Sequence, residues 1–173
     1  MNAELDLSVP PATAEINWNA LYTDLLPRVY NFMRYRLGDS PEAEDLTATT
    51  FEKAWRARWR YRNDRGAFST WLFTIARNVA TDYYRRQQPD VSLESLPEQA
   101  DPAVPERLAE QQDELSRLGA LLAQLPPRER ELVALKYGAG LTNRFIAKLT
   151  GLSESNVGTI LHRTVQHLRE QWN

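Results

Sequence analysis

The segment from Leu141 to Glu170 constrains the fold of this chain more than any other part of the sequence. Thr142 is placed to cap a short helix, and Gly151 is placed to release the chain from it. Ser153 is placed to cap a second, longer helix, because a serine hydroxyl accepts a hydrogen bond from an amide at a helix start. Two helices joined by a glycine-containing turn form a helix-turn-helix, the unit that places a second helix in a DNA groove.

The rest of the sequence also has the three- and four-residue spacing of amphipathic helices, and no convincing run alternates in polarity as a strand does. We therefore expect an all-α fold. The apolar spacing predicts helices over residues 18–37, 41–61, 69–88, 106–124 and 127–137, followed by the helix-turn-helix and a final helix to about residue 171. Ser40-Pro41-Glu42 is a strong helix-start signal, and Gly38 and Pro126-Pro127 supply breaks.

Residues 89–105 divide the chain into two halves. They contain four prolines, four acids and no base, a composition that solvates the chain and breaks helices. We predict a flexible N-terminus over 1–17, a helical domain over 18–88, a linker over 89–105 and a helix-turn-helix domain over 106–173.

Charge and composition exclude several classes of protein. The net charge is −2, but residues 18–88 carry a net +4 and residues 128–173 a net +3, so two mildly basic blocks flank an acidic one. Such segregated charge predicts weak DNA binding by the isolated chain. The chain has no cysteine and two isolated histidines, so we expect no disulfide, metal or cofactor. No catalytic constellation, secretion signal or membrane span is visible, which favours a cytoplasmic protein that is not an enzyme.

Residues 55–71 interleave aromatic side chains with arginines. Arg56, Arg58, Arg60, Arg62 and Arg65 fall within ten residues, and guanidinium groups beside aromatic rings suit the phosphates and unstacked bases of single-stranded DNA. The alternative is that the aromatic residues are core and the arginines a solvated face. For Trp55, Phe68 and Trp71 taken singly, we favour the core.

Two further groups suit contact with DNA. On the third helix, the spacing places Arg77, Asn78, Thr81 and Arg85 along one polar side, opposite an apolar stripe of Leu72, Ile75 and Val79. On the final helix, Val157, Leu161, Thr164 and Leu168 are expected to face the core. The same periodicity predicts that five residues of this helix point outward, toward the major groove: Ser155, Asn156, Thr159, Ile160 and Arg163. We expect the DNA backbone to be contacted by Thr142, Asn143 and Arg144.

Together these residues resemble the extracytoplasmic-function sigma factors, the small two-domain members of the sigma-70 family of bacterial RNA polymerase. The resemblance covers most of residues 18–172. The motifs that carry it are Asp45-Leu46, Thr50-Phe51 and Ala54-Trp55; Gly66, Phe68-Ser69-Thr70-Trp71-Leu72, Ile75-Ala76-Arg77-Asn78 and Asp82-Tyr83; and Leu125-Pro126, Arg130, Leu135, Ile146-Ala147, Leu149, Val157, Leu161-His162-Arg163 and Leu168.

The resemblance implies a transcription initiation factor that binds the β and β′ subunits of core RNA polymerase, directs it to promoters and aids melting. Its partners would be core polymerase, promoter DNA in duplex and melted form, and an anti-sigma factor, without membrane insertion. It implies a core-binding helix with Asp45, Leu46, Thr49, Phe51, Glu52, Trp55 and Arg56. It also implies that the minus-ten DNA element is contacted by Arg62, Asn63, Arg65, Phe68, Ser69, Thr70, Trp71, Arg77, Asn78 and Arg85. The outward residues of the last helix, with Thr142, Asn143 and Arg144, would read the minus-thirty-five element.

The sequence departs from the family pattern at several positions. Ala48 and Thr49 stand where the family often has glutamine and an acid, and Phe145 stands where it usually has glutamate. Gly158, Thr159 and Ile160 replace residues that are commonly basic, so no promoter sequence is transferred to this chain. Ile160 is suited to a thymine methyl instead.

Two other functions compete with this interpretation. A helix-turn-helix regulator that acts without polymerase would form a dimer to read paired half-sites, and it leaves the aromatic–arginine cluster without a role. An adaptor that binds only proteins would have no effect on transcription.

Overall fold

The computed structural model describes residues 16–37, 41–87 and 106–173, and in these ranges the regular secondary structure is all helical. In chain order the helices are α1 (Trp18–Leu37), α2 (Glu42–Arg56), a 3-10 turn (Arg58–Arg60), α3 (Phe68–Gln87), α4 (Glu106–Gln124), α5 (Pro127–Val133), a π-helical turn (Ala134–Gly138), α6 (Asn143–Thr150) and α7 (Glu154–Trp172). Within these ranges the all-α expectation is confirmed. No helix among them combines the length and apolar character needed to cross a bilayer.

Most expected helices lie within a residue or two of their predicted bounds, and two do not. The second helix was expected to continue to residue 61, but α2 ends at Arg56 and a 3-10 turn follows. The fifth was expected to continue as α-helix to residue 137, but its last turn widens into π-helix. The predicted N-terminal segment 1–17 and linker 89–105 lie mostly or wholly outside the described residues.

The first three helices form the N-terminal half. Their buried faces include Val29 and Phe32 of α1, Ala54 of α2 and Leu72 and Ala76 of α3, which are fully enclosed. Phe32 and Phe73 meet edge to face, with ring centroids 6.1 Å apart. This core holds α2 and α3 side by side on α1.

The helix-turn-helix has the predicted caps. The Thr142 hydroxyl accepts a hydrogen bond from the Phe145 amide at 3.2 Å, and the Ser153 hydroxyl accepts one from the Asn156 amide at 3.1 Å. Between them Gly151 ends α6 at φ +74°, a left-handed conformation that favours glycine. Ile146, Val157 and Leu161 are buried between α6 and α7.

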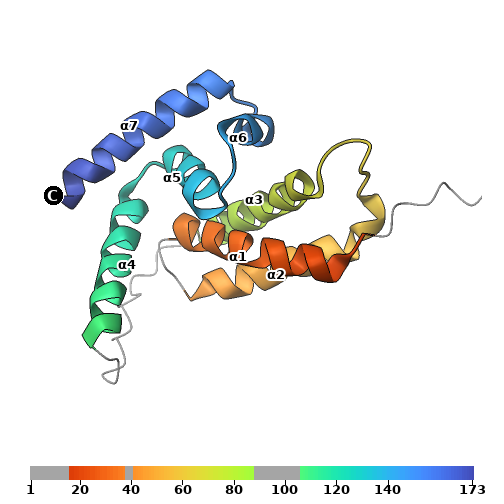
Figure 1. Cartoon of the computed structure of the whole chain (residues 1–173), viewed down its shortest axis with the longest axis horizontal. Helices are drawn as coiled ribbons and strands as arrows, with labels where there is room; N and C mark the ends of the chain where they lie inside the picture. Colours follow the sequence, from red (N-terminus) through yellow and green to blue (C-terminus); the bar gives the residue numbers. More distant parts are fainter. Residues whose placement is uncertain (1–15, 38–40, 88–105) are drawn as a thin grey trace, which may run out of the picture.

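The two halves of the chain pack directly on each other (Figure 1). One continuous hydrophobic core contains residues of both halves, including Met33, Phe73, Leu132 and Leu135. The closest approach is between α1 and the π-helical turn. A Cβ added to Gly138 would lie 2.8 Å from the Asn31 carbonyl oxygen. Only glycine therefore allows the two backbones to come this close.

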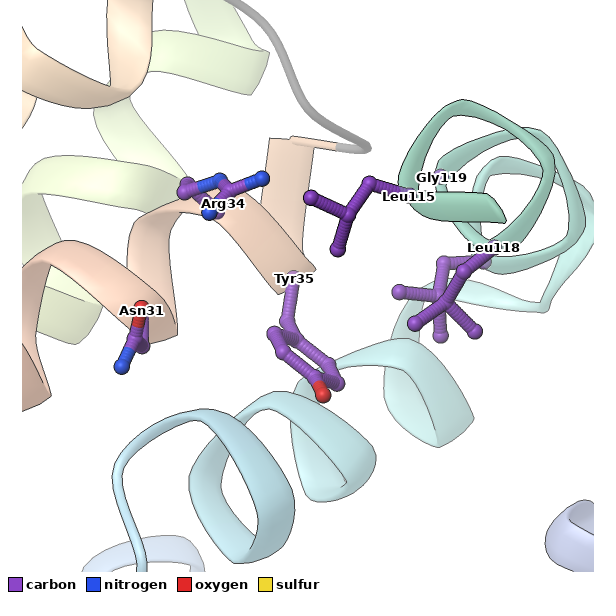
Figure 2. Close-up of a pocket in the computed structure, with 7 residues that line it drawn as sticks. Asn31, Arg34, Tyr35, Leu115, Leu118 and Gly119 are labelled. Carbon is purple, nitrogen blue, oxygen red and sulfur yellow. The ribbon is translucent and has the colours of Figure 1, made fainter. Parts of the chain in front are cut away.

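Helix α4 of the C-terminal half also packs against α1. Figure 2 shows its Leu115, Leu118 and Gly119 opposite Asn31, Arg34 and Tyr35 of α1. The groove between them is narrow, with a volume of about 40 Å³. The Arg28 guanidinium adds a hydrogen bond of 2.8 Å to the Ala139 carbonyl, so backbone polar groups of the C-terminal half are satisfied by the N-terminal half.

We predict that Gly158→Ala stabilises the protein. Gly158 lies inside α7, where its flexibility costs about 0.5–1 kcal/mol relative to alanine. A Cβ there would meet the Asn143 amide nitrogen at 3.5 Å, an ordinary contact. Urea denaturation should show a gain of that size in the free energy of unfolding.

Gly151→Ala is the matched control, because the same substitution at φ +74° forces a Cβ into the left-handed region and costs about 1–2 kcal/mol. A stability loss at position 158 would show that this glycine has a packing role that the helix does not reveal.

Candidate DNA-binding and polymerase-binding surfaces

A pocket of about 300 Å³ lies over the loop between the 3-10 turn and α3. The residues that line it are Arg60, Tyr61, Arg62, Arg65, Gly66, Ala67, Thr70 and Trp71. Three guanidinium groups and two aromatic rings therefore surround one opening. The Tyr61 hydroxyl donates to the Gly66 carbonyl at 3.1 Å and holds the two ends of the loop together. Such a pocket can hold a flat base while arginines contact its phosphates.

Below this pocket the aromatic side chains form a packed cluster. Phe68 meets Trp18, Tyr61 and Trp71 with centroids 5.2–5.4 Å apart. Phe68 is 8% exposed, so it supports the loop from below and is not itself a surface for DNA. The core interpretation of Phe68 is thus confirmed. Trp71 is half-buried, packs against Phe68 and also lines the pocket; its contact with DNA stays a prediction.

Asp64 shapes the rim of the pocket. Arg62 donates two hydrogen bonds to its carboxylate, at 3.2 and 3.0 Å. This pairing, followed by nearby Arg62 and Arg65 charges, holds the pKa of Asp64 below its ordinary value. The loop therefore keeps its carboxylate ionised and its Arg62 oriented. Asn63 and Ser69, also predicted to contact DNA, lie in and beside the loop without lining the pocket.

Trp55 differs from the prediction. It was expected in the core, yet it is 50% exposed and lies at the second-last position of α2. One face of its ring meets the edge of Trp18 at 5.3 Å. Arg58 lies 4.0 Å from the Trp55 ring and 4.6 Å from the Trp59 ring. Trp59 itself is 81% exposed, and the sequence analysis did not single it out.

Helix α3 presents a second hollow beside α2. Asn78, Thr81 and Arg85 line it together with Lys53 of α2 and Ile75. Residues 78, 81 and 85 share one face because they are spaced by three and four. Asn78, Thr81 and Arg85 therefore lie on one side of α3, as predicted. Ile75 was expected on the opposite, buried side, but it lines the same hollow.

Arg77 does not belong to this face, contrary to the prediction. Its guanidinium points toward the C-terminal half, where it pairs with both carboxylate oxygens of Glu131 at 2.8 and 3.3 Å. A further N–H donates to the Leu149 carbonyl at the end of α6. Arg77 is one turn before Thr81 but about 100° from Asn78 around the helix, and the C-terminal half covers the side on which it lies. Spacing alone could not show that a second domain would cover the Arg77 side.

The outer surface of α2 carries most of the residues predicted to bind polymerase. Asp45, Thr49, Glu52 and Arg56 recur along one side of the helix, and Glu52 pairs with Arg56 at 2.6 Å. Leu46 and Phe51 are half-buried. Phe51 meets the exposed ring of Tyr22 at 4.8 Å, so α1 and α2 together expose an apolar edge beside the charged ridge.

The start of α7 exposes Ser155, Asn156, Thr159 and Arg163 as predicted. The prediction for Ile160 was wrong, because this residue is 7% exposed and packs in the core. The buried residues of α7 are Val157, Ile160, Leu161 and Thr164. Its core-facing side is therefore wider than the predicted stripe, which left out residue 160. His162, which was set aside as an isolated surface histidine, lies exposed one turn after Thr159 and adds to the outward face.

The start of α6 is less open than expected. Thr142 and Arg144 are exposed, but Asn143 is half-buried with its amide near Gly158. Its side-chain oxygen is buried without a hydrogen-bond partner. Phe145 packs against the core, so the two apolar departures from the family pattern, Phe145 and Ile160, both serve packing.

Comparisons with known proteins match this arrangement. The model described as Sigma-70 region 2 matches residues 21–89, and the one described as Sigma-70, region 4 matches residues 115–168. The RNA polymerase sigma factor CarQ of Myxococcus xanthus is 33% identical over 153 residues, which cover 87% of this chain and 86% of CarQ. This chain belongs to the sigma factors of bacterial RNA polymerase.

The ECF RNA polymerase sigma factor BldN of Streptomyces coelicolor is 32% identical over 152 residues, which cover 86% of this chain but only 57% of BldN. The matches place the chain in the extracytoplasmic-function group.

A solved structure shares the fold of this sigma factor. The sigma factor RpoE of Bartonella quintana, in complex with the anti-sigma factor NepR, superimposes with a TM-score of 0.69. The two chains are 22% identical, over 88% of this chain and 94% of RpoE.

We predict that Asn78→Ala and Arg77→Ala have different effects. Asn78 is exposed, so its loss should leave the stability of the free sigma factor unchanged. It should lower promoter opening by roughly 3- to 10-fold, the equivalent of one hydrogen bond of about 0.5–1.5 kcal/mol. Arg77→Ala should instead destabilise the free chain by about 1–3 kcal/mol, because it leaves the enclosed Glu131 carboxylate unpaired. Permanganate footprinting and urea denaturation measure the two effects.

Gln112→Ala is the control for Asn78→Ala, since Gln112 is an exposed polar residue of α4. A stability loss from Asn78→Ala, or unchanged stability after Arg77→Ala, would contradict this division of roles.

Proposed function

We propose that this sigma factor binds core RNA polymerase through α2, captures a melted minus-ten base in the loop pocket and reads the minus-thirty-five element with α7. It supplies promoter choice and melting, and the RNA-forming chemistry belongs to the polymerase, in the cytoplasm. The observation that carries the proposal is the pocket walled by Tyr61 and Trp71 and rimmed by Arg60, Arg62 and Arg65. A base-sized aromatic pocket with phosphate-binding groups at its mouth has no use in a protein that reads only duplex DNA.

Base capture sets an energetic requirement on this pocket. Removing a base from the stack costs a few kcal/mol, and stacking on an aromatic ring returns about 1–3 kcal/mol per base. The arginines at the mouth add contacts to the adjacent phosphates. The pocket is therefore suited to trap a base that polymerase has helped to expose, and less suited to melt a duplex alone.

The exposed face of α7 supports reading of duplex DNA. Ser155, Asn156 and Thr159 offer hydrogen-bonding groups to base edges, and Arg163 offers a charge to a base or phosphate. Ile160 is excluded from this role by its burial.

The packing of the two halves supports a closed free state that opens on polymerase. The minus-ten and minus-thirty-five positions are roughly 25 base pairs apart, or roughly 85 Å at about 3.4 Å per base pair. In the closed chain, Arg77 of the N-terminal half touches α6 of the C-terminal half. One molecule cannot span that length of promoter until this contact breaks.

An anti-sigma factor is a further proposed partner. RpoE of Bartonella quintana was solved with one, and the shared fold makes a similar partner reasonable for this chain. The exposed rings of Tyr22 and Trp59 offer an apolar surface for core polymerase or for such an inhibitor.

Transcription with purified core polymerase tests the proposed function. We expect run-off RNA from a subset of genomic templates only when the sigma factor is added. A helix-turn-helix regulator would need another sigma factor, and an adaptor would give no promoter-dependent RNA. Absence of added RNA on every genomic template would overturn the proposal.

Arg163→Ala should weaken binding of the holoenzyme to the upstream element and make it less salt-dependent, by about one phosphate contact. The measurement is the slope of log affinity against log salt for holoenzyme on promoter duplex. Gln166→Ala, exposed one turn further along α7, is the control. An unchanged slope in Arg163→Ala would show that this residue touches no phosphate.

A further inference from the structure

A cavity of about 370 Å³ lies at the junction between the two halves. Arg36 of α1, Thr81, Tyr84 and Arg85 of α3, and Pro127 and Arg130 of α5 line it. Three arginines from three helices thus converge on one space, and none of the described residues that line it is acidic. Its volume falls in the range of small-molecule sites, about 300–1,000 Å³.

Arg36 is the least expected of these residues. It is 8% exposed, its Nε has no hydrogen-bond partner, and its guanidinium lies 4.9 Å from the Tyr84 ring. No ion pair between described residues includes it. Burial is the main reason that the pKa of Arg36 is lowered; the charges of Glu131 and Tyr84 offset part of this effect, and those of Arg130 and Arg77 add to it. A buried cation normally has a paired anion.

The other two arginines add positive charge beside Arg36. Among the described residues Arg130 donates to neutral oxygens only, the Tyr84 hydroxyl at 3.2 Å and the carbonyls of Ala123 and Leu125, and its Nε is also buried without a partner. Arg85 makes one loose ion pair with Asp82, at 3.7 Å. The carboxylate of Glu131, whose charge acts on Arg36, forms its ion pair with Arg77.

We propose that this cavity binds a small molecule that carries a phosphate or pyrophosphate group. Arginine is suited to phosphate oxygens because its planar N–H groups bond them in pairs. The hydroxyls of Thr81 and Tyr84 add neutral polar groups to the walls. The phosphates of duplex DNA are not the ligand, because a rigid duplex cannot enter a recess that reaches Arg36.

Binding at this site has a consequence that rests on the proposed function. The cavity is complete only while α5 lies against α1 and α3, so its ligand binds the closed chain and not the open one. Such a ligand shifts the population toward the closed form. It would hold the sigma factor away from promoters, as a metabolite-controlled inhibitor.

The test uses the free full-length chain and no polymerase, so its outcome is independent of the proposed function. Pyrophosphate, inorganic phosphate and ATP are titrated separately by calorimetry. We expect saturable binding of pyrophosphate or ATP. Arg85→Gln and Arg130→Gln should each weaken it about tenfold, the loss of one charge-assisted contact. Arg85 is largely exposed, so its substitution does not endanger folding.

Two further variants complete the experiment. Arg169→Gln, an equal charge change at an exposed position of α7, should leave the affinity unchanged. Arg77→Ala, which removes a closing contact without lining the cavity, should weaken binding by linkage. The proposal is overturned if none of the three ligands binds, or if Arg169→Gln weakens binding as much as Arg85→Gln. Unchanged affinity in Arg77→Ala would overturn the link between the ligand and closure.

Discussion

The ion pair between Arg77 of α3 and Glu131 of α5 is the interaction on which the closed arrangement depends. It joins the two halves in a partly enclosed place, where a charge-assisted pair is stronger than at an open surface. The same guanidinium also caps the carbonyl end of α6 through Leu149. A single side chain thus fixes α5 and α6 against α3, and with them the position of the helix-turn-helix.

This contact changes the interpretation of the DNA-binding surface. Asn78 and Arg85 remain on an exposed hollow beside α2, whereas Arg77 is engaged with the other half. The closed chain leaves the pocket beside Tyr61 and Trp71 and the start of α7 exposed, and under the proposed function the Arg77 contact must break before both reach one promoter. Gly138 reinforces the closure, because its missing side chain lets α1 and the π-helical turn meet backbone to backbone. The same packing brings Arg36, Arg85 and Arg130 together at the junction cavity.

Much of the local structure could be predicted from the sequence, for identifiable reasons. Thr142, Gly151 and Ser153 specify caps and a turn through their own chemistry, and each has the predicted role. The family resemblance likewise rests on short motifs. Errors arose where the outcome depended on neighbours far along the chain. Ile160 is buried because the core-facing side of α7 is wider than one stripe, and Trp55, near the end of α2, is half-exposed.

The sequence by itself determined the helices, their caps and the two DNA-binding motifs, because periodicity and capping act within a few residues. Only the tertiary structure decided that Arg77 serves the junction, that Tyr61 and Trp71 form the walls of one pocket and that Arg36, Arg85 and Arg130 converge. Tyr61 and Trp71 meet across a loop, and the other contacts join residues far apart in the chain, such as Arg77 with Glu131 and Leu149; such contacts are selected by shape and charge over the whole fold. No local pattern encodes them.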